Sequence, residues 1–150
     1  MMGVSKKGTL GRALGVTAAA GLAFVLAAPQ AQASPAPCSA AARACVDLSA
    51  NSAWLVNAGS VTYGAVPITS GKAGYRTPVG SFKVTYKDID HWSKAFNGPM
   101  PFSVFFTTSG VAFHEGSLSQ LSHGCIHLSP EAARVFYDNL APGDIVEVVR

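Results

Sequence analysis

Outside its first 33 residues, the sequence lacks an excess of charge of either sign. The chain has 11 Lys and Arg against 8 Asp and Glu, and three of the basic residues, Lys6, Lys7 and Arg12, lie near the N-terminus. The rest of the chain then carries 8 basic and 8 acidic residues, which gives no net charge when His is neutral. Nucleic-acid binding needs a basic patch on the folded domain. The charge balance therefore predicts no nucleic acid among the partners.

The sequence also lacks long apolar runs, with one exception near the N-terminus. After the basic head comes an uncharged apolar run, Ala13 to Ala28, which is shorter than the ~20 residues that a bilayer span needs. The small residues Ala31 and Ala33 precede Ser34, as at a signal-peptidase site. We predict a secretory signal peptide over residues 1–33, cleaved after about Ala33, and an exported protein in the cell wall, the periplasm or the medium. An uncleaved anchor is the alternative.

Cysteine is scarce, and its count of three is odd. In an exported protein, an odd count suggests one disulfide and one thiol left over. Cys38 and Cys45 lie seven positions apart near the expected new N-terminus, where a bridge stabilises a segment that otherwise frays. We therefore predict a Cys38–Cys45 disulfide at an N-terminal segment, 34–44, followed by one domain over 45–150. Cys125 is then the free thiol.

No internal repeat or low-complexity tract interrupts the expected domain, and most of it has the pattern of strands. Only one stretch is a clear helix: Ser129 suits the N-cap, Pro130 the first helical position and Glu131 the first turn. We predict a mainly β (α+β) single small domain, a mixed-sheet sandwich or barrel-like fold with one helix late in the chain. The expected strands and hairpins cover residues 44–48, 52–69, 81–87, 102–114 and 145–149.

A long stretch from Asp88 to Pro101 breaks the strand pattern with charges, two prolines and a glycine. We predict a loop here, because loops of this length inside a small domain are usually functional and often act as lids. Its large apolar residues, Trp92 and Phe96, either grip a ligand or are buried in the core.

Cys125 stands in the segment "LSHGCIHL", between His123 and His127 and shortly before the predicted helix. Imidazoles and a helix N-terminus lower the pKa of a thiol, and we predict such a lowered pKa and a nucleophilic role for Cys125. The base is His123, on the same face of an extended segment, or His114 at the end of the preceding strand. We favour His114, because a base on a neighbouring strand reaches the sulfur without bending its own backbone.

A zinc site is the rival chemical interpretation of the same residues. His114, His123, Cys125 and His127 offer up to four ligands of the types that zinc prefers. On a straight strand, however, ligands at alternate positions from 123 to 127 spread over ~13 Å, too far for one ion. We therefore predict no metal and no other cofactor.

The segment "VAFHEGSLSQLSHGCIHLS" resembles the signature of the L,D-transpeptidases of the bacterial cell wall, which have the YkuD-type fold. Two further segments are similar to this family: "ITSGKAGYRTPVGSFKV", with its Thr-Pro-x-Gly-x-Phe pattern, and "YDNLAPGDIVEVV". The likeness runs from about Cys45 to Val149. It implies that Cys125 is the nucleophile, that His114 is the general base oriented by a backbone carbonyl, and that the loop at 88–101 is a flap over the donor site.

The resemblance also implies substrate-binding roles around the cysteine. Ser122, His123 and Gly124 belong to the family's Ser-His-Gly-Cys turn, in which the backbone N–H groups of residues 123–125 form the oxyanion hole. His127 stands where arginine or asparagine is common, so it either holds a substrate carboxylate when protonated or packs on the sheet. The loop after His114 is short for the family, and Glu115 replaces a small residue and is expected to face solvent.

The implied activity is formation of 3-3 peptidoglycan crosslinks through a Cys125 thioester. The partners are peptidoglycan stem peptides, a donor tetrapeptide and an acceptor amine, and carbapenem-type β-lactams are expected covalent inhibitors. If water is the acceptor, the same site makes an L,D-carboxypeptidase. A non-catalytic cell-wall binding module is the alternative from a different class of protein.

Overall fold

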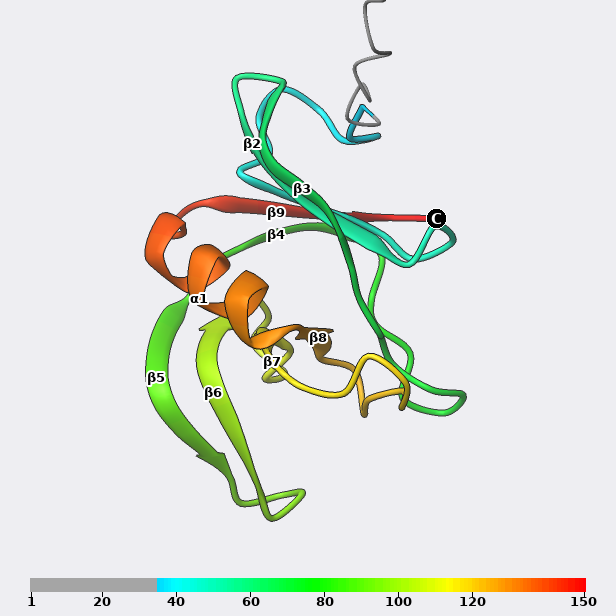
Figure 1. Cartoon of the computed structure of the whole chain (residues 1–150), viewed down its shortest axis with the longest axis vertical. Coiled ribbons are helices and arrows are strands. Elements are labelled where there is room, and N and C mark those ends of the chain that lie inside the picture. Colours follow the sequence, from blue (N-terminus) through cyan, green and yellow to red (C-terminus); the bar gives the residue numbers. More distant parts are fainter. Residues whose placement is uncertain (1–34) are drawn as a thin grey trace, which may run out of the picture. The chain divides into compact units, whose positions relative to one another are not determined.

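The computed structural model describes residues 35–150, so the predicted signal peptide lies outside the described range. Within that range the chain forms nine β-strands and one α-helix (Figure 1). This confirms the prediction of a mainly β fold with one late helix. In the described part of the chain, no helix has the length and apolar character needed to cross a membrane.

The first sheet has five strands in the order β3-β2-β1-β9-β4. Most neighbours are antiparallel, but β1 and β9, which come from opposite ends of the domain, run parallel at its centre. The strands are β1 (Ala44–Asp47), β2 (Ser52–Asn57), β3 (Ser60–Pro67), β4 (Gly80–Lys83) and β9 (Ile145–Val149).

The second sheet has four strands in the order β5-β6-β7-β8. The first three are antiparallel, whereas β7 and β8 are parallel. The strands are β5 (Tyr86–Ser93), β6 (Gly98–Phe105), β7 (Ala112–Glu115) and β8 (Ile126–Leu128). The stretch 81–87, predicted as one strand, is divided between the two sheets, because the chain leaves β4 at Lys83 and enters β5 at Tyr86.

The helix α1 (Pro130–Asn139) begins as predicted, with the Ser129 side chain accepting a hydrogen bond from the Ala132 amide at 3.2 Å. At its other end, the ammonium group of Lys87 donates to the carbonyl oxygen of Leu140 at 2.8 Å. A cation near the last carbonyls of a helix is favourable because these groups carry partial negative charge. This bond ties β5 to the end of the helix.

The main core brings both sheets and the helix together. Its fully buried side chains include Val46 of β1, Phe113 of β7, Ile126 of β8, Phe136 of α1 and Val148 of β9. Burial of large apolar side chains like these stabilises each by ~1.5–3 kcal/mol relative to exposure. Because β7 and β8 lie in this core, the ends of these two strands are held rigidly.

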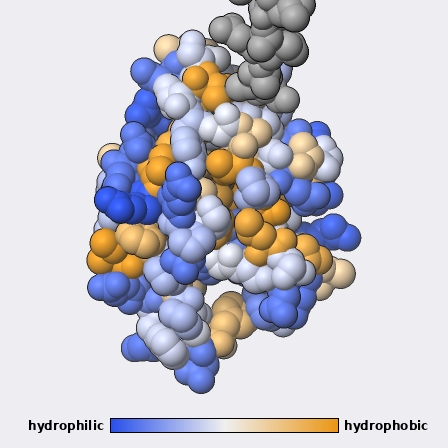
Figure 2. Space-filling model, viewed as in Figure 1, coloured by the Kyte–Doolittle hydropathy of each residue, from blue (hydrophilic) through white to orange (hydrophobic). Residues whose placement is uncertain are grey.

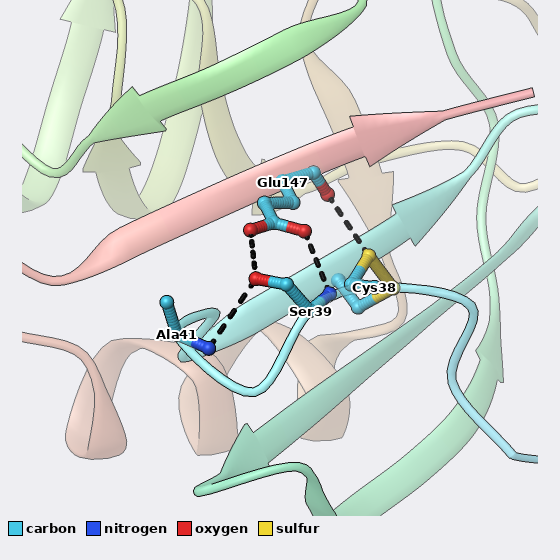
Figure 3. The surroundings of a disulfide bond; sticks show 5 residues. Cys38, Ser39, Ala41 and Glu147 are labelled. Carbon is cyan, nitrogen blue, oxygen red and sulfur yellow. Dashed lines mark hydrogen bonds between the residues drawn. A yellow bond between two sulfur atoms is a disulfide. The ribbon is translucent and has the colours of Figure 1, made fainter.

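The outer face of the first sheet is covered by the N-terminal segment, which the structure joins to β1 by a Cys38–Cys45 disulfide (Figure 3). This is the pair predicted from the sequence. The segment is also fixed to β9, because the Ser39 amide donates to the Glu147 carboxylate at 2.8 Å and the Ser39 hydroxyl donates to the same group. The disulfide packs with Trp54 and Val56 in a second, smaller core.

The prediction of a loop over 88–101 was wrong. This stretch belongs to a β-hairpin in which β5 and β6 pair and the turn covers only residues 94–97. Figure 1 shows the two strands extending as a curved hairpin past β7 and β8. Pro99 and Pro101 fit in β6 because β7 pairs only with Val104 and Phe105, so the missing amides are not needed on that side.

Candidate active site

A cleft of about 560 Å³ opens between the hairpin tip and the loop that joins β7 to β8. Figure 2 shows the surface hollowed at this end of the domain. One wall of the cleft belongs to the hairpin, with Phe96 and Met100, and the opposite wall belongs to the β7–β8 connection, with Leu121 and His123. The cleft brings together all four histidine and cysteine residues that were singled out from the sequence: His114, His123, Cys125 and His127.

Cys125 is a free thiol at the entrance to β8. Its sulfur lies 3.9 Å from the carbonyl oxygen of Gly110, and the side chain packs against Met100, Phe105 and Ala112. Burial raises the pKa of the Cys125 thiol, and a hydrogen bond from the Ala112 backbone only partly offsets this effect. The prediction of a lowered pKa was therefore wrong. Strand β8 separates Cys125 from the helix, whose N-terminus begins at Ser129, and the sulfur lies among apolar side chains.

His114 is buried in β7, with 6% of its surface exposed. Its Nδ1 lies 2.7 Å from the carbonyl oxygen of Glu115. Because a carbonyl oxygen only accepts, Nδ1 carries the hydrogen and Nε2 keeps its lone pair in the neutral ring. Burial lowers the pKa of His114 to about 4. Electrostatic repulsion from His127 and His91 also lowers this pKa, whereas the hydrogen bond to Glu115 raises it. At neutral pH the ring is therefore an uncharged base.

The sheet register sets the relation between these two groups. In the parallel pair β7–β8, Phe113 lies opposite Ile126 and His114 lies opposite His127. Cys125 lies two residues before His127, so the side chains of Cys125, His127 and His114 point to the same face of the sheet. Cys125 and His114 are diagonal neighbours on that face. Diagonal neighbours across a sheet are ~7–8 Å apart at their Cβ atoms, which long side chains can span. No hydrogen bond joins the two side chains among the bonds of residues 35–150, so both are held by other partners.

The turn before Cys125 is held by an internal network of hydrogen bonds. The hydroxyl group of Ser122, 3% exposed, accepts from the Gly124 amide at 3.0 Å and donates to the Cys125 carbonyl oxygen at 2.5 Å. The Ser122 hydroxyl, predicted to bind substrate, is thus engaged within the turn. Gly124 has a φ of 124°, a value that side chains other than glycine rarely adopt.

His123 lies at a bend and not on an extended strand, so it does not share a face with Cys125 as the alternative assignment of the base required. Its exposed ring stacks on Phe96 of the hairpin turn, with centroids 4.2 Å apart. Tyr75 meets the same ring edge-on at 4.8 Å. His123 thus connects the hairpin to the segment between β3 and β4.

His127 lies inside the cleft next to His114, with the ring centroids 4.9 Å apart and nearly perpendicular. Its Nδ1 lies 3.0 Å from the carbonyl oxygen of Ser117 and 3.0 Å from the Thr69 hydroxyl. The Thr69 hydroxyl itself donates to Ser117 at 2.6 Å. Both neighbours of Nδ1 therefore act as acceptors, which places the hydrogen of the neutral ring on Nδ1. Gly116 makes room for the ring, since a Cβ there would lie 2.6 Å from it.

The described residues contain no group of three or more His, Cys, Asp or Glu side chains arranged to hold a metal ion. The reason is geometric. The bend at His123 turns that ring toward Phe96, whereas the Nδ1 atoms of His114 and His127 both face backbone carbonyl groups. The four candidate ligands line one cleft but do not converge on one point.

Comparison with known proteins identifies the family. Residues 41–148 match the YkuD family model, described as the L,D-transpeptidase catalytic domain. The chain belongs to this family. The residues of the predicted Ser-His-Gly-Cys turn and His114 all lie within the matched range.

Two curated relatives are L,D-transpeptidases of Mycobacterium tuberculosis. The chain is 40% identical to L,D-transpeptidase 2 of strain CDC 1551 / Oshkosh over 91 residues, which is 60% of this chain and 18% of that protein. It is 32% identical to L,D-transpeptidase 1 of strain H37Rv over 103 residues, 56% of this chain and 41% of that protein. The chain thus spans less than half the length of these relatives.

Solved structures agree with this assignment. An L,D-transpeptidase from Stackebrandtia nassauensis superposes with a TM-score of 0.68 at 31% identity, covering 71% of this chain and 54% of that one. The L,D-transpeptidase LdtMt1 in complex with imipenem gives a TM-score of 0.62 at 28% identity, covering 69% of this chain and 56% of that one. The YkuD-type fold predicted from the sequence is therefore confirmed.

Three residues of the site were not assigned a role from the sequence: Thr69, Thr77 and Ser117. Thr69 and Ser117 hold His127 from two loops distant in sequence. Thr77 lies in the Thr-Pro-x-Gly-x-Phe pattern, but only the fold brings its hydroxyl group to the carbonyl oxygen of Gly124, at 2.7 Å. The Thr-Pro-x-Gly-x-Phe pattern was the feature of the sequence that could have pointed to Thr77.

Proposed function

We propose that the protein is a cysteine L,D-transpeptidase that forms 3-3 crosslinks between peptidoglycan stem peptides, with Cys125 as nucleophile and His114 as general base. The observation that carries the proposal is one cleft that holds a free thiol and, on the same face of the β7–β8 pair, a neutral imidazole whose Nε2 is unprotonated. Family membership supports the same activity.

Acylation begins from two neutral groups, because burial raises the pKa of Cys125 and lowers that of His114. His114 Nε2 takes the thiol proton as the sulfur attacks the carbonyl carbon between the third residue of the donor tetrapeptide and its terminal D-alanine. The oxygen of the tetrahedral intermediate lies against backbone amides of the turn before β8, those of His123 and Cys125, because the Gly124 amide donates to Ser122. His114 then returns the proton to the leaving amine of D-alanine, and a thioester on Cys125 remains.

Transfer reverses these roles. The amine of an acceptor stem attacks the thioester and gives a proton to His114, and the departing sulfur recovers that proton when the amide bond is complete. If water attacks in place of the amine, the product is a tripeptide and the enzyme is an L,D-carboxypeptidase. The partially apolar cleft, with Phe96, Met100 and Leu121, suits exclusion of water from the thioester.

His127 adds a specificity element to this proposal. With Nδ1 donating to Ser117, neutral His127 offers only an acceptor, Nε2, and so suits an N–H group of the substrate. It would bind a carboxylate only when protonated.

Incubation of the purified protein with disaccharide-tetrapeptide tests the activity directly. A transpeptidase releases D-alanine and yields a 3-3 crosslinked dimer, whereas a carboxypeptidase yields only tripeptide. A wall-binding module would leave the tetrapeptide intact, and its Cys125→Ser variant would bind the tetrapeptide as well as the wild type does. That result would contradict the proposal.

We also propose that the protein is exported and that residues 1–33 are removed as a signal peptide. The basic head, the apolar run and the small residues before Ser34 support this. N-terminal sequencing of protein from outside the cytoplasm should find a start close to Ser34. An N-terminus at Met1 in that fraction contradicts cleavage.

A further inference from the structure

We propose that Thr77 is a positioning residue that aims the Cys125 amide at the reacting carbonyl group by holding the carbonyl group of Gly124. This inference rests on the proposed acyl-transfer function and adds a residue to its machinery. Figure 1 shows the segment between β3 and β4 beside the segment between β7 and β8, and the structure joins them at Gly71 and Ser122.

The turn before Cys125 contains both engaged and free backbone amides. The Gly124 amide donates to the Ser122 hydroxyl at 3.0 Å, so it is already engaged. The amides of His123 and Cys125 have no acceptor among the hydrogen bonds of residues 35–150. The Cys125 amide belongs to the same residue as the attacking sulfur, so it is the donor best placed for an oxyanion formed there.

The Thr77 hydroxyl group sets the direction of the Cys125 amide. The peptide unit from Gly124 to Cys125 is trans and planar, so its C=O and N–H bonds point in opposite directions. Thr77 donates its hydroxyl hydrogen to the Gly124 carbonyl oxygen at 2.7 Å. The Cys125 amide therefore points away from Thr77. Gly124, which has no side chain to restrict rotation, would otherwise leave this peptide plane free to turn.

Thr77 is itself held in place by burial and by a backbone hydrogen bond. The residue is 3% exposed, and its hydroxyl oxygen accepts from the Gly71 amide at 3.0 Å. Gly71 must be glycine, because a Cβ there would lie 1.9 Å from the Tyr75 carbonyl oxygen. The residues beside Gly71 are bonded to the turn itself, since the Lys72 amide donates to the Ser122 carbonyl oxygen at 3.0 Å.

The hydroxyl group of Thr77 is thus held in place relative to the turn that it orients. Ser122 holds the next carbonyl group, that of Cys125, at 2.5 Å. One peptide plane is fixed on each side of the Cys125 Cα, and the amide of the first plane, that of Cys125, is left available. This arrangement gives the Thr-Pro-x-Gly segment a role in catalysis although it does not touch the thiol.

The test compares two reactions of Cys125 in the purified protein. Acylation by a carbapenem passes through an oxyanion, whereas alkylation by iodoacetamide needs only an accessible thiolate. Thr77→Val keeps the shape and removes the hydroxyl group, and Thr77→Ser keeps the hydroxyl group. Thr85→Val is the matched control, because the Thr85 hydroxyl also donates to a backbone carbonyl, that of Phe105, at 3.1 Å.

We expect Thr77→Val to lower the second-order rate of acylation roughly 10- to 100-fold, as misplaced or lost oxyanion donors do. Its alkylation rate should stay within about twofold of the wild-type rate, and Thr77→Ser and Thr85→Val should acylate like the wild type. If Thr77→Val does not fold, Thr77→Ala, which also removes the hydroxyl group, takes its place.

Equal acylation rates in wild type and Thr77→Val overturn the inference. An equal loss of acylation and alkylation also overturns it, because the substitution would then have changed the reactivity of the thiol and not the oxyanion donor. In both cases the wild type is acylated and the proposed function stands. A wild-type protein that is alkylated but never acylated overturns the proposed function, and the inference with it.

Discussion

The ring of Phe96, at the turn of the β5–β6 hairpin, stacks on the ring of His123 with centroids 4.2 Å apart and planes 20° from parallel. Phe96 is otherwise exposed, and His123 directly precedes the Gly124–Cys125 pair. The stack is thus a direct contact between the hairpin tip and the turn that precedes Cys125. It gives the hairpin the position of a lid over the cleft.

Phe96→Ala should loosen this lid. Aromatic pairs contribute about 0.5–1.5 kcal/mol beyond burial, so we expect a rise in KM for the donor peptide of roughly 2- to 10-fold. Hydrogen exchange at residues 94–97 should accelerate. Trp92→Ala is the matched control, since Trp92 is an exposed aromatic residue of the same hairpin. Equal effects of the two substitutions would show that the Phe96–His123 contact does not control the lid.

His114→Gln should abolish most of the acylation. General base catalysis contributes ~10²- to 10⁴-fold, and glutamine cannot accept the thiol proton at neutral pH. The rate of carbapenem acylation, measured by stopped-flow absorbance, should fall by this factor. His123→Gln is the control, because His123 is exposed and faces Phe96, and its effect should not exceed the roughly 10-fold expected from loss of that stack. A larger loss in His123→Gln than in His114→Gln would assign the base to His123 and contradict the account.

The stability of the fold should depend on pH through His114. Burial lowers the pKa of His114 from 6.5 to about 4, so the unfolded chain binds the proton first as the pH falls. The free energy of unfolding should be undiminished above pH 6.5 and should decrease by roughly 3 kcal/mol as the pH falls toward 4. Urea unfolding of wild type and His114→Gln checks this, and the variant should lack this part of the decrease. The pKa of Asp47 is lowered from 3.8, so its contribution to stability is lost as the pH falls below that value, outside this window. Identical pH dependence in both proteins would mean that His114 is not buried in its neutral form.

The thiol should react slowly at neutral pH. Because burial raises the pKa of Cys125 above the ordinary 9.0, the rate of iodoacetamide alkylation should keep rising above pH 9. A short unstructured cysteine peptide, measured in parallel, should reach its plateau at lower pH. A plateau for the protein below about pH 8 would instead reveal a stable thiolate–imidazolium pair in the free enzyme.

The Cys38–Cys45 disulfide should stabilise the fold without affecting the acylation of Cys125. Cys38 and Cys45 are separated by seven positions, for which loop-closure entropy predicts a stabilisation of about 2–3 kcal/mol. The double variant Cys38→Ser/Cys45→Ser should unfold at correspondingly lower urea concentration and still be acylated on Cys125 at the wild-type rate. A loss of acylation in the folded double variant would show that the N-terminal segment shapes the cleft.

Local chemical signals made several features predictable from the sequence. Ser129, Pro130 and Glu131 mark the start of a helix by capping rules, and the structure begins α1 there. The alternation around Asn57 to Ser60 predicts the β2–β3 hairpin, which is observed. The pairing of Cys38 with Cys45 followed from their short spacing and from the odd cysteine count.

Other features depend on tertiary packing, which sequence proximity does not reveal. The hairpin at 86–105 was hidden because most of its side chains are at least partly exposed, so no alternation appears, and because prolines occupy β6 where one side is unpaired. The pKa of Cys125 was predicted in the wrong direction, since the histidines were visible in the sequence and Met100, Phe105 and Ala112 were not. The contact from Thr77 to Gly124 spans 47 positions.

The most direct test of the central claim is intact-protein mass spectrometry after incubation with a carbapenem. We expect a covalent adduct on the wild type and on the Cys38→Ser/Cys45→Ser variant, and none on Cys125→Ala. A folded, reduced wild-type protein that gains no mass, or an adduct that persists in Cys125→Ala, would contradict it.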